Sequence, residues 1–138
     1  MKSKILRKRI FACLLDYLIY FTVSILYVIY FGNKDHEGTY SVNGLKTLPV
    51  FLFWLLYFII VESLFKATLG HYLLNLKVVQ IDNKEIGLKN SFKRHLIDII
   101  DLSFFGLPAY ISVKNSEKGQ RLGDLFAKTT IIESKKIK

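Results

Sequence analysis

The chain has 138 residues, of which 51% are apolar and 14% aromatic, with 20 Lys and Arg against 11 Asp and Glu, for a net charge of +9. This length predicts a single domain. The apolar and aromatic content excludes a disordered basic tail, and the single cysteine, Cys13, excludes a disulfide scaffold. Because the apolar residues come in long blocks, the composition indicates a membrane protein.

The first apolar block covers residues 10–31, and Asp16 is its only charge. A helix of this length, rising about 1.5 Å per residue, crosses a hydrocarbon core of roughly 30 Å. A cleaved secretory signal is the alternative, but the block is too long, contains Asp16 and is followed by no small-residue cleavage site. We therefore predict a first membrane span here.

A second apolar block covers residues 48–65, with Glu62 as its only charge. Its 18 residues are at the short end of the range for a spanning helix. Pro49 suits the first turn of a helix, where a missing N–H is tolerated. The block predicts a second span.

The third hydrophobic segment, residues 95–113, is ambiguous. Asp98 and Asp101 lie in its first half, and the run from Gly106 to Pro108 predicts a helix break at its centre. It can be read as a re-entrant or interfacial hairpin, or as a plain third span.

The distribution of basic residues bears on that choice. Residues 1–9 hold five Lys and Arg, residues 66–94 six and residues 114–138 seven, whereas residues 32–46 hold two. By the positive-inside rule the amino terminus and the 66–94 segment are cytoplasmic and 32–46 is outside. A complete third span would place the basic tail outside, so we favour a hairpin shielded by the two spans, with a cytoplasmic carboxy terminus.

Two β-rich runs, residues 76–81 and 129–132, predict short strands that could pair on the cytoplasmic side. The predicted fold class is an all-α membrane protein. It has two transmembrane helices, a third membrane-embedded broken segment and short cytoplasmic strands, in one domain over residues 1–138. The expected location is multi-pass in the inner or plasma membrane.

Four charged residues form the candidate intramembrane site. Asp16 lies roughly 9 Å into the first span, and Arg9 is two turns earlier on the same helical face. The second helix runs in the opposite direction, so Glu62 falls at a similar depth, and Lys66 can pair with it one turn on. The topology predicts one layer of charges just inside the cytoplasmic interface, formed by Arg9, Asp16, Glu62 and Lys66.

This layer has two interpretations. A pair of carboxylates in a low dielectric could be a proton or cation site, with Asp16 as the better candidate because it is deeper and has no cation one turn away. The alternative is an ion-paired network that fixes helix packing. His95 and Asp98 could ligate a metal, but no supporting ligand spacing is present, so we expect no metal or cofactor.

No nucleotide-binding, hydrolase, metalloprotease or redox motif occurs, and we expect no enzyme. Of the 20 basic residues, 18 lie on segments next to apolar blocks. That placement favours the bilayer and its anionic headgroups as the partner, and not nucleic acid.

Several short motifs follow one another along nearly the whole chain. An Arg-x-x-Ala-x-x-x-Asp pattern opens the first span, met by Arg9, Ala12 and Asp16. A Glu near the end of the second span is followed by a Thr-x-Gly element and a Leu-x-Val-Val run. These are met by Glu62, Thr68, Gly70 and the residues Leu76, Val78 and Val79. An Arg opens the third segment and an Arg-Leu-x-Asp-Leu-x-Ala-x-Thr pattern closes the chain, met by Arg94, Arg121, Leu122, Asp124, Leu125, Ala127 and Thr129.

In this order the motifs resemble the RDD family of small membrane proteins. One departure is His71, which stands where the family usually carries Lys after the Gly. The resemblance implies an integral membrane protein of mostly unassigned role and directs attention to Arg9, Asp16 and Asp124. Asp124 could cap a short helix begun by Leu125 or pair with Arg9.

Two functional hypotheses follow. The leading one is a small multi-pass membrane protein that assembles into oligomers and moves protons or cations. Some relatives are linked to sodium–proton exchange, which would fit Asp16 as a carrier; two or three spans would then need several copies, as a homo-oligomer, or a membrane partner. The competing hypothesis is a non-transporting scaffold or an accessory protein that binds lipid headgroups with its basic cytoplasmic face.

Overall fold

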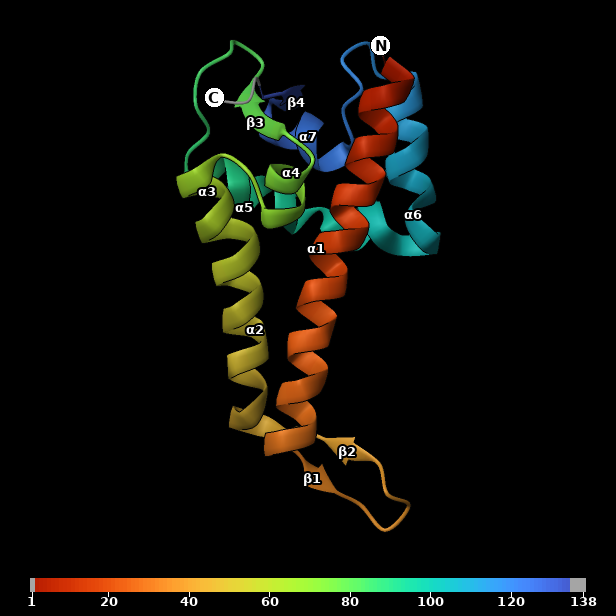
Figure 1. Ribbon diagram of the computed structural model, residues 1–138, viewed down its shortest axis with the longest axis vertical. Helices are drawn as coiled ribbons and strands as arrows, with labels where there is room; N and C mark the ends of the chain where they lie inside the picture. Colours follow the sequence, from red (N-terminus) through yellow and green to blue (C-terminus); the bar gives the residue numbers. More distant parts are fainter. Residues whose placement is uncertain (1, 135–138) are drawn as a thin grey trace.

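The computed structural model describes residues 2–134, with the side chains of all but residues 2–3, 99, 101–106 and 109. Two long helical rods lie side by side and run in opposite directions (Figure 1). The first rod is the single helix α1, Lys2–Phe31. The second is built end to end from η1 (Gly44–Thr47), α2 (Leu48–Trp54), the π-helical stretch η2 (Leu55–Val61) and α3 (Glu62–Phe65).

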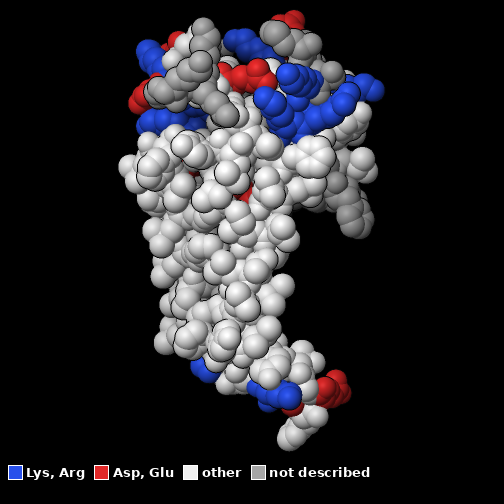
Figure 2. Space-filling model, viewed as in Figure 1, with Lys and Arg blue, Asp and Glu red and all other residues white. Residues whose placement is uncertain are grey.

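Both rods are long and apolar enough to cross a bilayer. The qualifying stretches are Lys4–Phe31, with 28 residues, and Gly44–Phe65, with 22. They contain the predicted spans 10–31 and 48–65. Figure 2 shows a band of uncharged side chains along the rods, with Lys, Arg, Asp and Glu gathered at the two ends.

A small hairpin joins the rods at one end of the molecule (Figure 1). Its strands are β1 (Asn33–Lys34) and β2 (Tyr40–Ser41), which pair antiparallel. The Asp35 carboxylate accepts the backbone N–H groups of Glu37 and Thr39, at 2.9 and 2.8 Å, and so closes the turn.

At the opposite end, residues 66–134 form what we call the head, which packs around the amino-terminal half of α1 (Figure 1). Its elements in chain order are α4 (Leu69–Leu73), β3 (Leu76–Gln80), α5 (Leu88–Leu96), α6 (Asp98–Asn115), α7 (Leu122–Ala127) and β4 (Thr129–Glu133).

The strands β3 and β4 pair antiparallel, in a register that opposes Leu76 to Glu133 and Gln80 to Thr129. Two isolated strands are only marginally stable, so they need a packed face. That face is a small core formed by Ala12, Leu76, Val78, Ile86 and Ile131. The prediction of two pairing strands is confirmed, and Ala12 of the first span belongs to their core.

The third hydrophobic segment is broken, but not where the sequence predicts. The break falls at Ile97, between α5 and α6, whereas Pro108 lies inside α6. The predicted break at Gly106 to Pro108 is therefore wrong. An internal proline removes one helical hydrogen bond, at a cost of about 3 kcal/mol. The hydrogen bonds of the other turns of α6 outweigh that cost. Asp101, the second acid that the sequence places in the first half of this segment, has a side chain that is not among those described.

Helix α6 turns back toward the amino-terminal end of α1. At its start, Tyr17 donates a hydrogen bond to the Asp98 carboxylate at 3.0 Å. Near its other end, Val113 lines a cavity together with Leu6. The strand β4 lies at that same end, where Lys8 pairs with Glu133 at 2.7 Å. Both ends of the described chain therefore lie at the same end of the rods (Figure 1).

Candidate functional site

The first polar cluster surrounds Asp16, whose side chain is buried in α1. Oδ1 accepts hydrogen bonds from the Tyr57 hydroxyl at 2.8 Å and the Gly70 backbone N–H at 2.7 Å. Oδ2 accepts one from the Thr68 hydroxyl at 2.6 Å. The first N–H groups of a helix have no partner within it, which leaves that of Gly70 in α4 free to reach Asp16.

His71 completes this cluster. Its Nδ1 lies 2.6 Å from the Thr68 hydroxyl and 3.6 Å from Asp16 Oδ2. Burial lowers the pKa of His71, against the opposing influence of Asp16. We call Asp16, Tyr57, Thr68, Gly70 and His71 the Asp16 site. It joins α1 and η2 to α4, and both oxygens of its carboxylate are occupied.

The second cluster is centred on Arg94 of α5, which is fully buried. Its Nε lies 3.0 Å from Glu62 Oε1 on the second rod. Its NH1 pairs with Asp124 of α7 and lies 3.3 Å from the Thr129 hydroxyl. Asp124 also pairs with Arg9 of α1. One guanidinium and one carboxylate thus link both rods to the head.

The same cluster continues through Asp98 at the start of α6. Asp98 Oδ2 lies 2.6 Å from His95 Nδ1, and Oδ1 lies 3.2 Å from a guanidinium nitrogen of Arg121. The other ring nitrogen of His95 lies 3.3 Å from Glu62 Oε2. The chain of contacts therefore runs from Glu62 through His95 and Asp98 to Arg121.

We call this cluster the arginine network; its members are Arg9, Arg94, Arg121, Glu62, Asp98, Asp124 and His95. Its three guanidiniums match its three carboxylates in charge. Burial raises the pKa of Asp124, but the arginines outweigh it and lower that pKa to about 2. Burial lowers the pKa of His95, but Asp98 and Glu62 outweigh it and raise that pKa to about 9.

The predicted layer is divided between these clusters. Arg9 and Glu62 join the arginine network, where their partners are Asp124 and Arg94. Asp16 lies in its own site. Lys66 lies against Glu85 at 3.6 Å and donates to the carbonyl oxygens of Ser63 and Ile86. The predicted pairing of Lys66 with Glu62 is therefore wrong: Lys66 has left-handed backbone geometry where α3 ends.

The two predicted roles for Asp124 can be compared with the structure. It pairs with Arg9, as one alternative had it. The other alternative, a cap for a helix begun by Leu125, is wrong because α7 begins at Leu122. Asp124 lies in the first turn of α7 and accepts the backbone N–H of Arg121 at 3.1 Å. Its side chain therefore caps the amino-terminal end of the helix from a position within it.

Sequence reasoning missed Tyr17 and Tyr57 as donors to buried carboxylates. Both lie in aromatic-rich spans, where a tyrosine is typical of an interfacial belt and carries no separate signal. It also missed His95 as a partner of Glu62. Among the described residues, no group of three or more His, Cys, Asp or Glu side chains is arranged to hold a metal ion.

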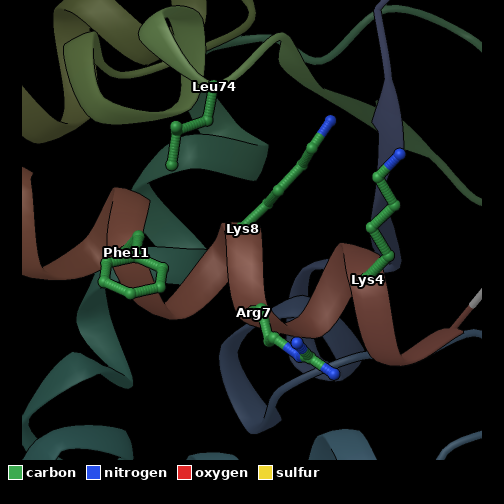
Figure 3. A pocket seen from close by; sticks show the side chains of 5 residues that line it. All are labelled: Lys4, Arg7, Lys8, Phe11 and Leu74. Carbon is green, nitrogen blue, oxygen red and sulfur yellow. The ribbon is translucent and has the colours of Figure 1, made fainter.

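A basic cavity of about 430 Å³ lies on α1, outside both clusters. It is lined by Lys4, Arg7 and Lys8, with Phe11 and Leu74 as its apolar part. Figure 3 shows Lys4 and Lys8 extending from α1 toward one side, and Arg7 leaving the helix on another. We call these five residues the basic cavity.

The comparisons with known proteins agree with the motif order. The sequence model of the RDD family matches residues 5–128. Searches of curated proteins and of solved structures gave no match. The match spans both apolar rods and the head up to α7, including all members of the Asp16 site and of the arginine network. With two apolar helices and this match, the chain is a membrane protein that belongs to the RDD family.

Proposed function

We propose that this chain is a non-transporting membrane protein whose basic end binds the headgroups of anionic lipids. The observation that carries this proposal is the basic cavity. Three cations from the first turns of α1 line this cavity, and Glu133 lies against one of them, Lys8. The cavity therefore retains an excess of positive charge, which complements a lipid phosphate.

The position of the basic cavity supports the same proposal. Lys4, Arg7 and Lys8 come directly before the apolar run that begins at Ile10. In a spanning α1 they would lie at headgroup depth, while Phe11 and Leu74 offer apolar surface to the start of an acyl chain. Basic residues at that depth on the cytoplasmic side are attracted to anionic lipids by about 1 kcal/mol each.

The arginine network supports a role without transport. Its guanidiniums and carboxylates are matched to one another, and all of them except that of Arg121 are buried. An ion moving through it would have to separate a buried pair, which costs about 3–5 kcal/mol. We infer that the network holds the head on the rods in the orientation that presents the basic cavity.

The test measures lipid retained by the purified protein, using native mass spectrometry with phosphatidylglycerol and phosphatidylcholine in mixed micelles. We expect wild type to prefer phosphatidylglycerol. Changing Lys4, Arg7 and Lys8 together to Gln should weaken that preference by more than about tenfold, since each removed cation contributes about 1 kcal/mol.

A matched variant removes the same charge elsewhere on the head, by changing Lys89, Lys114 and Lys118, all of them exposed, to Gln. If both triple variants lose the preference equally, the effect is that of net charge and the proposed site is wrong. If neither loses it, headgroup binding at the basic cavity is rejected.

Proton- or cation-coupled transport by an oligomer is the second candidate, favoured by Asp16 and His71 lying 3.6 Å apart within the Asp16 site. In proteoliposomes, Asp16→Asn should abolish flux while the protein still inserts and keeps its oligomeric size. Absence of wild-type flux under both a pH and a sodium gradient rejects this candidate. Flux that is lost in Asp16→Asn rejects the non-transporting proposal.

A further inference from the structure

A second cavity, which we call the lateral groove, lies between α1 and α6. Its volume is about 720 Å³, within the range of roughly 300–1,000 Å³ that is typical of ligand sites. Its walls are mostly apolar: α1 contributes Leu6, Ile10, Leu14 and Phe21, and α6 contributes Leu107 and Val113.

The charged groups that line the lateral groove are basic. Arg9 and Arg121 line it together with His71, and among the side chains that the structure describes no carboxylate does. The acids that pair with these arginines, Asp98 and Asp124, belong to the arginine network and do not form the groove wall. A ligand in the groove would therefore meet guanidinium groups and apolar side chains together, which suits an amphiphile with an anionic group.

We propose that the lateral groove binds one anionic phospholipid, with an acyl chain between α1 and α6 and its phosphate toward Arg9. The α1 wall extends from Leu6 to Phe21, which at about 1.5 Å per residue is roughly 22 Å of a spanning helix. A groove of this length along a span suits an extended acyl chain. Its contents would come from the bilayer, since lipid chains surround such a helix.

This site is independent of the proposed function, because the lateral groove and the basic cavity share no lining residue. The two sites can therefore fail separately. Cys13 offers a direct probe of the groove: it is the single cysteine of the chain, it lines the groove and it is half-buried.

The experiment measures the rate at which N-ethylmaleimide labels Cys13 in delipidated protein, with and without added phosphatidylglycerol. Only the unoccupied fraction reacts, so lipid at about ten times its dissociation constant should slow labelling by about tenfold. Phosphatidylcholine at the same concentration should protect much less. Equal protection by the two lipids overturns the anionic specificity.

The control places the thiol elsewhere on the same helix. The double variant Cys13→Ala, Leu18→Cys carries it at an outward position that is 64% exposed and does not line the groove. We expect lipid to leave its labelling rate unchanged. The proposal is overturned if phosphatidylglycerol does not slow the labelling of Cys13, or if it slows labelling equally at positions 13 and 18.

A second pair of variants tests the groove by filling it. Leu14→Trp adds bulk at a lining position, whereas Leu18→Trp adds it outside. In the triple Gln background, which removes lipid held by the basic cavity, native mass spectrometry should show one tightly retained phospholipid with Leu18→Trp and none with Leu14→Trp. The triple Gln variant of the basic cavity should keep full protection of Cys13, and loss of that protection would show that the two sites are one.

Discussion

Asp124 of α7 links its own helix to α1 and α5. It accepts the backbone N–H of Arg121, the residue just before α7, and pairs with Arg9 and Arg94, and it is fully buried. A buried carboxylate between two guanidiniums is stable only while both remain, because removing one partner leaves an uncompensated charge. The same reasoning applies to Arg94 between Asp124 and Glu62.

This argument predicts the effect of Arg94→Gln. The change leaves Glu62 and Asp124 each short of a cation, so we expect a loss of about 3–5 kcal/mol in the free energy of unfolding. Chemical unfolding in detergent micelles measures it. The exposed Lys89→Gln on the same helix should change stability by less than about 0.5 kcal/mol. Equal effects of the two variants would contradict a structural role for the network.

His95 makes the stability depend on pH. The pKa of His95 is about 9, raised from an ordinary value of 6.5. Protonated His95 therefore stabilises the fold fully below pH 6.5, and this contribution is lost as pH rises from 6.5 through 9. His71 acts outside this window, because its lowered pKa removes stability only as pH falls below 6.5.

We therefore expect the melting temperature of wild type to fall between pH 6.5 and 9. In His95→Gln the fall should be much smaller, and the difference from wild type should be largest near pH 6.5. His36→Gln, in the exposed hairpin, is the matched control and should follow wild type. A pH profile of His95→Gln parallel to that of wild type would exclude His95 as the group that titrates.

At the scale of elements, the contact between α1 and α4 depends on two small residues. Ala12 is fully buried, and Gly70 lies so close to α1 that an added Cβ would be 2.9 Å from the Asp16 carboxylate and closer still to the Ala12 carbonyl oxygen. A backbone atom cannot yield as a flexible side chain can. The Arg-x-x-Ala-x-x-x-Asp and Thr-x-Gly motifs therefore meet as one packing contact.

Gly70→Ala should force α4 away from α1 and weaken the Asp16 site. Overpacking of this kind costs about 1–3 kcal/mol, measured as a lower melting temperature in detergent. Gly87→Ala is the control: its added Cβ would meet nothing within 4 Å, and its backbone is already extended. Comparable losses in both variants would mean that general glycine effects, and not this contact, determine the outcome.

At the scale of the whole molecule, charge lies at both ends and an uncharged band lies between them (Figure 2). The first turns of α1 and the strand β4 meet at one end, through Lys8 and Glu133. The hairpin β1–β2 occupies the other. We expect the head to be cytoplasmic and the hairpin outside, because the Lys- and Arg-rich segments belong to the head and to the start of α1.

This orientation can be tested by cysteine accessibility in a Cys13→Ala background. In intact cells, a membrane-impermeant maleimide should label Lys34→Cys in the hairpin and should label Glu117→Cys in the head only after permeabilisation. Both positions are exposed, so burial does not bias the comparison. Labelling of Glu117→Cys from outside would favour α6 as a complete third span. It would refute the prediction that residues 95–113 re-enter or lie along the membrane and return the chain to the cytoplasmic side.

The amino-acid sequence by itself determined the two apolar rods, the strand pair and the motif order of the family. These depend on signals that are local: the length of an apolar run, alternation over a few residues, and short spacings. The same local reasoning placed the break of the third segment at Pro108, because a proline is visible in sequence. The actual break at Ile97 carries no comparable signal.

Only the tertiary structure decided which charges pair. Helical spacing relates residues on one helix to each other: Arg9 to Asp16 on the first, and Glu62 to Lys66 on the second. The observed partners, Arg9 with Asp124 and Arg94 with Glu62, are 115 and 32 positions apart in the chain. Their pairing depends on how α5 and α7 pack against the rods, and residue spacing along one helix does not contain that information.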